Sequence, residues 1–260
     1  EGLLAGEVAV RRPPDRLDSA LLSKTVPAPL SPYLEVLLKY VRKARADPEG
    51  EDLADNLTRA LRTDLGYGLS ILNAVRPAGR PTAILVRFTG LDVVKKFFMR
   101  YQRPDQFGNV KDQEIEAYGH VIADYYRFLD AWIGLLQAHV RESPRVMVIS
   151  PYGLAPLDFI TRAFHAVAGQ GSLSGTYRGG GPGLLLAAGP DIRQAGRLED
   201  AALQDVLPAL LYLLDLPVGR DMKGRPLAGL VSDAYAQSHA VAAVPSWGTV
   251  QVVGPSTMVR

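Results

Sequence analysis

Apolar residues recur at helical spacing over the middle of the chain. Between residues 112 and 140 they are separated by steps of three and four, at Ile115, Tyr118, Ile122, Tyr125, Leu129, Trp132 and Leu136. This spacing places the side chains on one stripe of a helix. We therefore predict a helix over 112–140 whose apolar stripe packs against a core or a sheet.

Four further segments carry a helical pattern. One begins after Ser31, with Pro32 at its first position, and is ended by the turn residues of 47–50. The others are predicted over 52–75, weakened around Gly66 and Gly68, from Gly90 to about 102, and over 199–215. Pro208 lies inside the last of these, so that helix is expected to bend.

Short apolar runs between the helices predict strands. They cover 82–88, 145–149 and 183–188, and residues 241–253 are expected to form one or two edge strands. Strands that alternate with helices indicate an α/β fold built in layers around a sheet.

The first 32 residues differ in composition from the rest. They contain five prolines, Pro13, Pro14, Pro27, Pro29 and Pro32, which exclude long helices and central strands. We predict an extended Pro-rich segment over 1–32 and a single α/β domain over 33–260.

The bulk composition narrows the function classes. The chain has 260 residues, 47% hydrophobic and 22% charged, a net charge of +2 and no cysteine. Thiolate catalysis and disulfides are thereby excluded, and no strong positive field points to nucleic acid. No run reaches the roughly 18 apolar residues that a membrane span needs.

Two segments carry the most specific motifs. Residues 174–192 read Ser-Gly-Thr-Tyr-Arg-Gly-Gly-Gly-Pro-Gly-Leu-Leu-Leu-Ala-Ala-Gly-Pro-Asp-Ile, and residues 204–225 run from Gln-Asp-Val-Leu-Pro to Asp-Met-Lys-Gly-Arg. Together with 118–130 they resemble the type I phosphodiesterase and nucleotide pyrophosphatase branch of the alkaline phosphatase superfamily. The resemblance covers roughly 64–248. It implies a layered fold with a mostly parallel central sheet flanked by helices, whose N-terminal portion is missing or atypical here.

Enzymes of that branch use two metal ions, usually zinc, and a Thr or Ser nucleophile. The segment Phe88 to Phe97 resembles their metal-ligand Asp followed four residues later by His. Asp92 is retained, but Lys96 stands at the His position, and an ammonium group has no lone pair for a metal. Without its partner, Asp92 also fits a turn or helix-cap residue.

Two tyrosines stand where the resemblance places further ligands. The branch carries Ser-Asp-His-Gly where this chain has Ser-Pro151-Tyr152-Gly, and His where it has Tyr177. Tyr152 also fits a tight turn that packs an aromatic ring. We predict that Asp92, Lys96, Tyr152 and Tyr177 line one cleft, as candidate ligand-binding residues, with no metal ligands and no catalytic residue. The two tyrosines are expected to stack or hydrogen-bond there.

The resemblance leaves two main functions open, beside a third class, a small-anion or glycan sensor that uses the vacated cleft and Lys96. The first is a catalytically inactive domain that serves as a binding or scaffolding subunit with a protein partner, without a cofactor. The second is a phosphoester or sulfate ester hydrolase with a remodelled zinc site, its nucleophile supplied by a segment before Glu1. Related proteins imply an extracytoplasmic location, with a tether before Glu1. Thr25 is a poor nucleophile candidate because its surroundings are Pro-rich.

A basic run follows Asp92. Lys95, Lys96, Arg100 and Arg103 either form a solvated helix face or hold a small anion in place of a metal. Residues 179–183, Gly-Gly-Gly-Pro-Gly, lack the Gly-Lys-Ser/Thr of a phosphate-binding loop and predict a loop with unusual backbone angles.

Overall fold

The chain divides into two compact units. A computed structural model describes residues 26–78, 83–108, 110–140, 143–194 and 196–248. Unit 1 comprises residues 1–144 and 152–183, and unit 2 comprises 145–151 and 184–260, whereas the sequence predicts one domain from residue 33. Most of the predicted Pro-rich segment 1–32, Thr25 included, lies outside the described residues.

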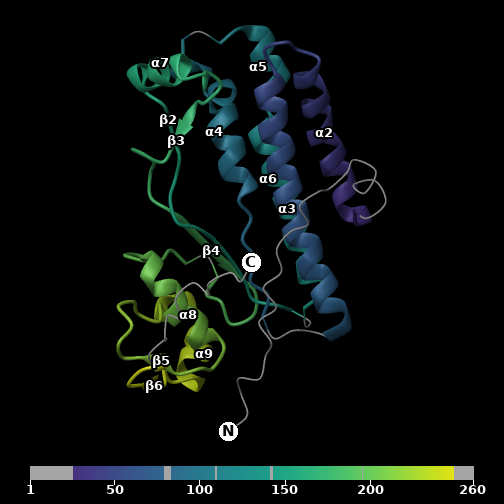
Figure 1. Ribbon diagram of the computed structural model, residues 1–260. Helices are drawn as coiled ribbons and strands as arrows, with labels where there is room; N and C mark the ends of the chain where they lie inside the picture. Colours follow the sequence, from purple (N-terminus) through teal and green to yellow (C-terminus); the bar gives the residue numbers. More distant parts are fainter. Residues whose placement is uncertain (1–25, 79–82, 109, 141–142, 195, 249–260) are drawn as a thin grey trace, which may run out of the picture. The chain divides into compact units, whose positions relative to one another are not determined.

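Unit 1 is built around a bundle of helices that lie side by side (Figure 1). They are α2 (Ser31–Arg45), α3 (Glu51–Ala78), α4 (Gly90–Gln102), α5 (Asp112–Tyr118) and α6 (Val121–Gln137), with 3-10 turns η1 (Ala28–Leu30) and η2 (Pro104–Gln106). The largest side chains without exposed surface are Trp132, Tyr125, Phe98 and Phe128. The core therefore forms where the apolar faces of α4 and α6 meet α2 and α3.

The helix predictions in this unit are largely confirmed. The helix after Ser31 begins at Ser31 itself and ends before the turn at 47–50, and α3 runs unbroken past Gly66 and Gly68. The helix predicted over 112–140 is two helices, because the chain turns at Gly119 and His120. A Cβ at Gly119 would lie 2.7 Å from the Ile115 carbonyl oxygen, so the turn requires glycine there.

The strand predicted over 82–88 is wrong for the described residues of that segment. Residues 83–89 form no regular secondary structure and lie in no strand pair. Ile84, Val86 and Phe88 pack against the helical core, while Leu85 is 74% exposed. The apolar run thus buries one side on helices, although its composition is that of a strand buried on both faces.

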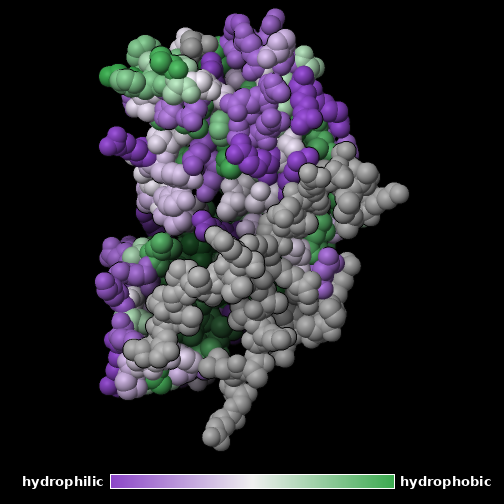
Figure 2. Space-filling view, in the orientation of Figure 1, coloured by the Kyte–Doolittle hydropathy of each residue, from purple (hydrophilic) through white to green (hydrophobic). Residues whose placement is uncertain are grey.

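A smaller part of unit 1 follows the helical bundle in sequence. It contains β2 (Ala155–Pro156), α7 (Phe159–Val167) and β3 (Gly175–Thr176), with β2 and β3 paired antiparallel. Helix α7 is capped by Asp158, which accepts from the Thr161 amide at 2.9 Å. Its outer face is apolar and uncovered, and Figure 2 shows hydrophobic side chains gathered over this helix. The exposed side chains are Phe159, Ile160, Phe164 and Val167, at 67–91% exposure.

Unit 2 opens on an antiparallel strand pair. Strand β1 (Val146–Ser150) pairs with β4 (Leu184–Ala188) in a register that sets Val148 opposite Leu186. Met147, Leu185 and Ala187 pack on the core of this unit, whereas Leu184 and Leu186 are half exposed. Both strands were predicted at nearly these positions, but as members of a mostly parallel central sheet flanked by helices.

The remainder of unit 2 consists of short elements. They are η3 (Leu203–Asp205), α8 (Val206–Leu213), β5 (Val218–Gly219), η4 (Ala228–Leu230), α9 (Asp233–Ser238) and β6 (Ala243–Val244). Pro208 lies in the first turn of α8, where a missing N–H costs no helical hydrogen bond, so no bend is needed. The predicted edge strand survives as β6, paired parallel with β5, and residues 249–253 lie outside the described residues.

The fold is therefore mixed α/β, as predicted. The mostly parallel central sheet is not found among the described residues, whose strands form three separate pairs, two antiparallel and one parallel. No helix in the described part of the chain is both long and apolar enough to span a membrane.

A buried carboxylate joins three helices of unit 1. Asp64, on α3, has no exposed surface. It accepts from the backbone amides of Thr89 and Gly90 at 2.9 and 3.0 Å, and from the Tyr125 hydroxyl at 2.8 Å. It thereby caps the N-terminus of α4, which receives no side-chain cap from Thr89. A Cβ at Gly90 would lie 1.9 Å from the Tyr125 hydroxyl oxygen, so only glycine fits.

The Asp64 carboxyl makes the stability of the protein depend on pH. Burial, opposed by its hydrogen bonds to Tyr125, Gly90 and Thr89, raises its pKa from 3.8 to about 6. The folded state then binds more protons than the unfolded state between about pH 4 and 6, so the free energy of unfolding falls as pH rises through this window. Since each pKa unit corresponds to about 1.4 kcal/mol, the loss is roughly 3 kcal/mol.

We expect Asp64→Asn to remove this loss, because the amide keeps the shape of the side chain without its charge. Chemical denaturation at pH 4, 5, 6 and 7 measures the difference in unfolding free energy between the native chain and the variant. Carboxyls with lowered pKa values, Asp158 and Asp205, titrate below this window and do not interfere. A difference that stays constant over the four pH values would contradict the role given to Asp64.

Two glycines on packed helices are expected to respond in opposite ways. A Cβ at Gly68 of α3 would lie 2.4 Å from the ring of Trp132, which is wholly buried, whereas a Cβ at Gly134 of α6 meets nothing within 4 Å. Gly68→Ala should cost about 1–3 kcal/mol through overpacking. Gly134→Ala should stabilise by about 0.5–1 kcal/mol, because alanine favours the helix. Urea denaturation of both variants checks this, and equal effects would show that the two helices are packed otherwise.

Candidate functional site

The N-terminal half of α4 presents two of the predicted site residues. Asp92 lies in the first turn of the helix and Lys96 one turn later, so both side chains project from the same face. Asp92 is not the cap of this helix, because Asp64 supplies that function. The carboxylate of Asp92 is favoured in the first turn by the positive end of the helix dipole.

The Ser174 motif joins the second half of the site to α4. The Ser174 amide donates to the Lys96 carbonyl at 2.6 Å, and its hydroxyl donates to the same carbonyl at 3.0 Å. The Arg100 amide in turn donates to the Ser174 hydroxyl oxygen at 3.3 Å. A Cβ at Gly175 would lie 2.8 Å from the Lys95 carbonyl oxygen, so glycine permits this approach. Tyr177, three residues after Ser174, is thereby brought beside Lys96.

The glycine-rich segment 179–183 holds the turn that carries Tyr152. The Gly153 amide donates to the Gly181 carbonyl at 3.0 Å, and the Gly180 amide donates to the Tyr177 carbonyl at 3.0 Å. Gly179 adopts a φ of 75°, as the prediction of unusual backbone angles requires. A Cβ at Gly180 would lie 2.1 Å from the Gly153 carbonyl oxygen, so this contact between two loops depends on glycine.

These supports place all four predicted side chains together in unit 1. The rings of Tyr152 and Tyr177 meet edge to face with centroids 4.5 Å apart. The ammonium of Lys96 lies 4.2 Å from the centroid of the Tyr177 ring, within the range of a cation–π contact. Tyr177 is also hydrogen-bonded to Asp92 and to Tyr152. We call these four residues the tyrosine cluster.

The hydrogen bonds of the tyrosine cluster run in one direction. An ionised Asp92 accepts only, so the Tyr177 hydroxyl donates to it and the Tyr152 hydroxyl donates to Tyr177. The hydrogen bond to Tyr177, followed by the charge of Asp92, raises the pKa of Tyr152. Burial, followed by the charge of Asp92, raises the pKa of Tyr177. Both phenols therefore keep their protons at neutral pH.

Arg87 belongs to the same neighbourhood, although sequence reasoning did not select it. Its positive charge lowers the pKa values of both Tyr152 and Tyr177, against the larger effects that raise them. Arg87 lies on segment 83–89, five residues before Asp92. Its nearness to Asp92 in sequence was the one signal available, because the two tyrosines whose pKa values it lowers lie 65 and 90 positions later.

The side chains of the tyrosine cluster do not fit a zinc ion. Asp92 is its only carboxylate, Lys96 offers no lone pair, and the two phenols stay protonated, whereas zinc takes imidazole, thiolate or carboxylate ligands. Within the described ranges, no group of three or more His, Asp or Glu side chains is placed to hold a metal.

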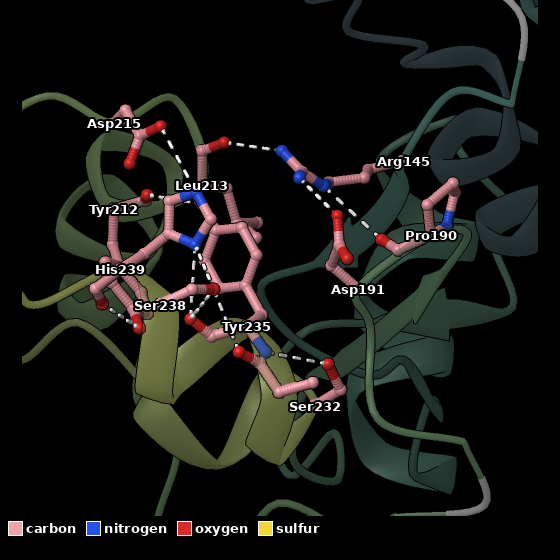
Figure 3. Close-up of polar contacts among 11 residues, drawn as sticks. Arg145, Pro190, Asp191, Tyr212, Leu213, Asp215, Ser232, Tyr235, Ser238 and His239 are labelled. Carbon is pink, nitrogen blue, oxygen red and sulfur yellow. Dashed lines mark hydrogen bonds and ion pairs between the residues drawn. The ribbon is translucent and has the colours of Figure 1, made fainter.

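A second polar cluster, in unit 2, brings a serine, a histidine and an aspartate close together in space (Figure 3). The Ser238 hydroxyl oxygen lies 2.9 Å from Nδ1 of His239, whose Nε2 lies 3.6 Å from the Asp215 carboxylate. The Ser238–His239 distance is within the hydrogen-bond reach of a nucleophile and its base, whereas the His239–Asp215 distance is too long for the hydrogen bond of an orienting acid. None of the three was selected from the sequence, because nothing in their spacing links Asp215 to the other two.

The hydrogen bonds of Ser238 argue against a nucleophile. Its hydroxyl lies 2.9 Å from the Ala234 carbonyl oxygen and 3.2 Å from that of Tyr235, and because both oxygens only accept, they compete with His239 for its single proton. The His239 ring is stacked on Tyr235 with centroids 4.0 Å apart and planes 6° apart. The guanidinium of Arg145 lies 5.0 Å from the centroid of the same Tyr235 ring. Because the imidazole covers one face of the ring, Arg145 occupies the other.

Arg145 fastens this cluster to the rest of unit 2. Its guanidinium donates to Asp191 at 2.6 Å and to the carbonyls of Leu213 and Pro190 at 2.7 and 3.3 Å. The start of β1, the loop after β4 and the end of α8 are thus held by one side chain (Figure 3). We assign this cluster a role in stability.

The long motif 204–225 also has a structural role. The buried carboxylate of Asp205 accepts from the amides of Ala202 at 2.9 Å and Arg225 at 2.8 Å, and the Arg225 bond is the main cause of its lowered pKa. A Cβ at Gly224 would lie 1.9 Å from the Gln204 carbonyl oxygen. The two ends of the motif are therefore in backbone contact, which explains its residue types by structure.

Comparison with protein-family models, with curated proteins and with solved structures finds no match to this chain.

The hydrogen-bond chain of the tyrosine cluster predicts linked tyrosine titrations. Tyr177→Phe removes the hydroxyl that accepts from Tyr152, so the pKa of Tyr152 should fall. Asp92→Asn removes the negative charge that both phenols face, so both pKa values should fall. Carbon-13 NMR of labelled tyrosine Cζ against pH reports each residue. Tyr40, whose pKa is raised by burial and by Asp124, is the control that should not respond. Unchanged Tyr152 titration in both variants would show that the phenols are not coupled.

Proposed function

We propose that this chain is a catalytically inactive domain of the phosphodiesterase-like branch of the alkaline phosphatase superfamily, serving as a binding or scaffolding subunit. The proposal includes the layered α/β fold of that superfamily. The sequence motifs at 88–97, 150–153 and 174–192 motivate it. One observation supports it most strongly, namely the composition and geometry of the tyrosine cluster.

Four residues from three separate motifs meet in this cluster, at the positions for which the resemblance implies metal ligands. Independent motifs of an unrelated protein would have no reason to converge on one point. The convergence of Asp92, Lys96 and Tyr177 supports the superfamily origin of the site. Their chemistry, an ammonium and two protonated phenols around one carboxylate, supports the loss of metal-dependent hydrolysis.

The polar groups of the cluster also satisfy one another. The carboxylate of Asp92 accepts from Tyr177, the oxygen of Tyr177 accepts from Tyr152, and the charge of Lys96 lies over a ring. A general base or nucleophile needs an atom aimed at substrate rather than at its neighbours. The cluster is therefore suited to holding α4, β3 and the Tyr152 turn together.

The uncovered apolar face of α7 supports the binding part of the proposal. Phe159, Ile160, Phe164 and Val167 lie on a single helix with most of their surface exposed. Proteins that act alone seldom leave a group of large apolar side chains in water, and such patches commonly contact another macromolecule.

The proposal is tested by restoring ligands. In the double variant Lys96→His with Tyr177→His, two imidazoles join Asp92 at positions already in contact, which gives a three-ligand set suited to zinc. We expect the double variant to bind zinc at least about tenfold more tightly than Lys96→His alone. Competition with a chromogenic chelator measures the affinity, and circular dichroism confirms folding. The native chain should show no zinc- or manganese-dependent turnover of a nitrophenyl phosphodiester.

Two results would overturn the proposal. Near-stoichiometric zinc in the native chain, with turnover, would favour the remodelled hydrolase. A folded double variant that binds zinc no better than the single one would show that the cluster does not stand at a former metal site.

A further inference from the structure

A hollow on unit 1 lies apart from the tyrosine cluster. Its volume is about 320 Å³, and it opens to solvent between α4, α6 and the segment that precedes β2. The residues that line it are Lys95, Met99, Gln102, Arg103, Ile122, Tyr126 and Leu154. None of them belongs to the tyrosine cluster, and the proposed function does not use them.

The lining of the hollow divides into an apolar floor and polar ends. Met99 and Ile122 are buried, and Tyr126, on the next turn of α6, is about half exposed. Lys95 lies on α4 and Arg103 directly follows the end of this helix, so the eight residues from one to the other separate their backbones by about 12 Å. The two cations therefore stand toward opposite ends of the hollow, with the apolar surface between them.

No carboxylate lines the hollow, so its two positive charges are not neutralised from within. The ammonium of Lys95 lies 5.0 Å from the centroid of the Tyr126 ring, which holds it at the wall by a cation–π contact. Arg103 is paired through Nε with Asp105 at 3.6 Å. More than half of the Arg103 and Asp105 side chains is exposed. Exposed ion pairs contribute little to stability, so an anion can compete with Asp105 for the guanidinium.

We propose that this hollow binds a small organic dianion whose two acidic groups are separated by a flat apolar or aromatic body. One acidic group pairs with Lys95, and the other pairs with Arg103 beside the Gln102 amide. The body lies on Met99 and Ile122 against the Tyr126 ring. The volume is near the lower limit of ligand pockets, which fits a molecule built on a single ring.

This proposal stands independently of the proposed function. The tyrosine cluster is tested by zinc binding at positions 96 and 177, and neither residue lines the hollow. A failure of one experiment therefore leaves the result of the other intact.

The test uses three probes of equal width and different charge. Terephthalate carries a carboxylate at each end of a ring, benzoate carries one, and 1,4-benzenedimethanol carries none. Affinities for the native chain are measured from amide chemical shifts in NMR titrations at low salt. We expect terephthalate to bind about tenfold more tightly than benzoate, and the diol not to bind. Raising the salt should weaken terephthalate binding, since both ion pairs are open to solvent.

Variants assign the two ends. Lys95→Ala and Arg103→Ala should each reduce terephthalate affinity to that of benzoate for the native chain. Lys39→Ala removes the same charge from the exposed face of α2 and should change nothing, which controls for net charge. Tyr126→Ala should weaken benzoate and terephthalate alike, because both lose the ring.

The outcomes are decisive in both directions. Shifts confined to α4, α6 and Leu154, with the tenfold preference lost in either cation variant, support the proposal. Equal affinity for terephthalate and benzoate would overturn it, and so would an unchanged affinity in Lys95→Ala or in Arg103→Ala. It would also be overturned if about 10 mM terephthalate, enough to detect a dissociation constant of about 1 mM, caused no shifts.

Discussion

The carboxylate of Asp64 is the constraint on which the candidate site of unit 1 depends. It is buried among α3, α4 and α6, and its hydrogen bonds fix where α4 begins. A helix start that is fixed to within one residue also fixes the rotation of the helix about its axis. The directions of Asp92 and Lys96, two and six residues beyond Gly90, follow from that rotation. A slip of one residue would turn both side chains by about 100° away from Tyr177.

In the tyrosine cluster, too, hydrogen bonds to the backbone of α4 determine where the side chains lie. Ser174 bonds to the backbone of α4 at Lys96 and Arg100, and so determines where Tyr177 meets the helix. The glycines of 179–183 allow two loops to touch backbone to backbone, which determines where Tyr152 lies. Tyr152 and Tyr177 remain partly exposed, at 37% and 38%, and their hydroxyl groups find hydrogen-bond partners within the cluster. The resulting site is ordered by its own hydrogen bonds, whereas the hollow beside α4 leaves two cations facing solvent.

Sequence reasoning succeeded where the signal was local. Helices with an apolar stripe were placed close to their true bounds, because the spacing of Leu34, Leu37 and Val41 is itself the property that buries them. It failed where an apolar run has two ways to be buried. Residues 83–89 have the composition of a strand inside a sheet, yet Ile84, Val86 and Phe88 pack on helices. Lys95 and Arg103 of the hollow were noted as part of a basic run that could hold an anion, but Arg87 and the apolar lining of the hollow were missed, because their neighbours come from distant parts of the chain.

Spacing, turn residues and the chemistry of single side chains were enough to predict most of the helices, the positions of β1 and β4, and the residues of the tyrosine cluster. Three features could be known only from the folded chain. The described strands pair separately, Asp64 rather than Asp92 caps α4, and Lys95 and Arg103 share a hollow while Lys96 covers a ring. Each of these depends on contacts between residues far apart in the chain. The spacing of residues along a sequence does not tell which distant residue will contact a given side chain in the folded chain.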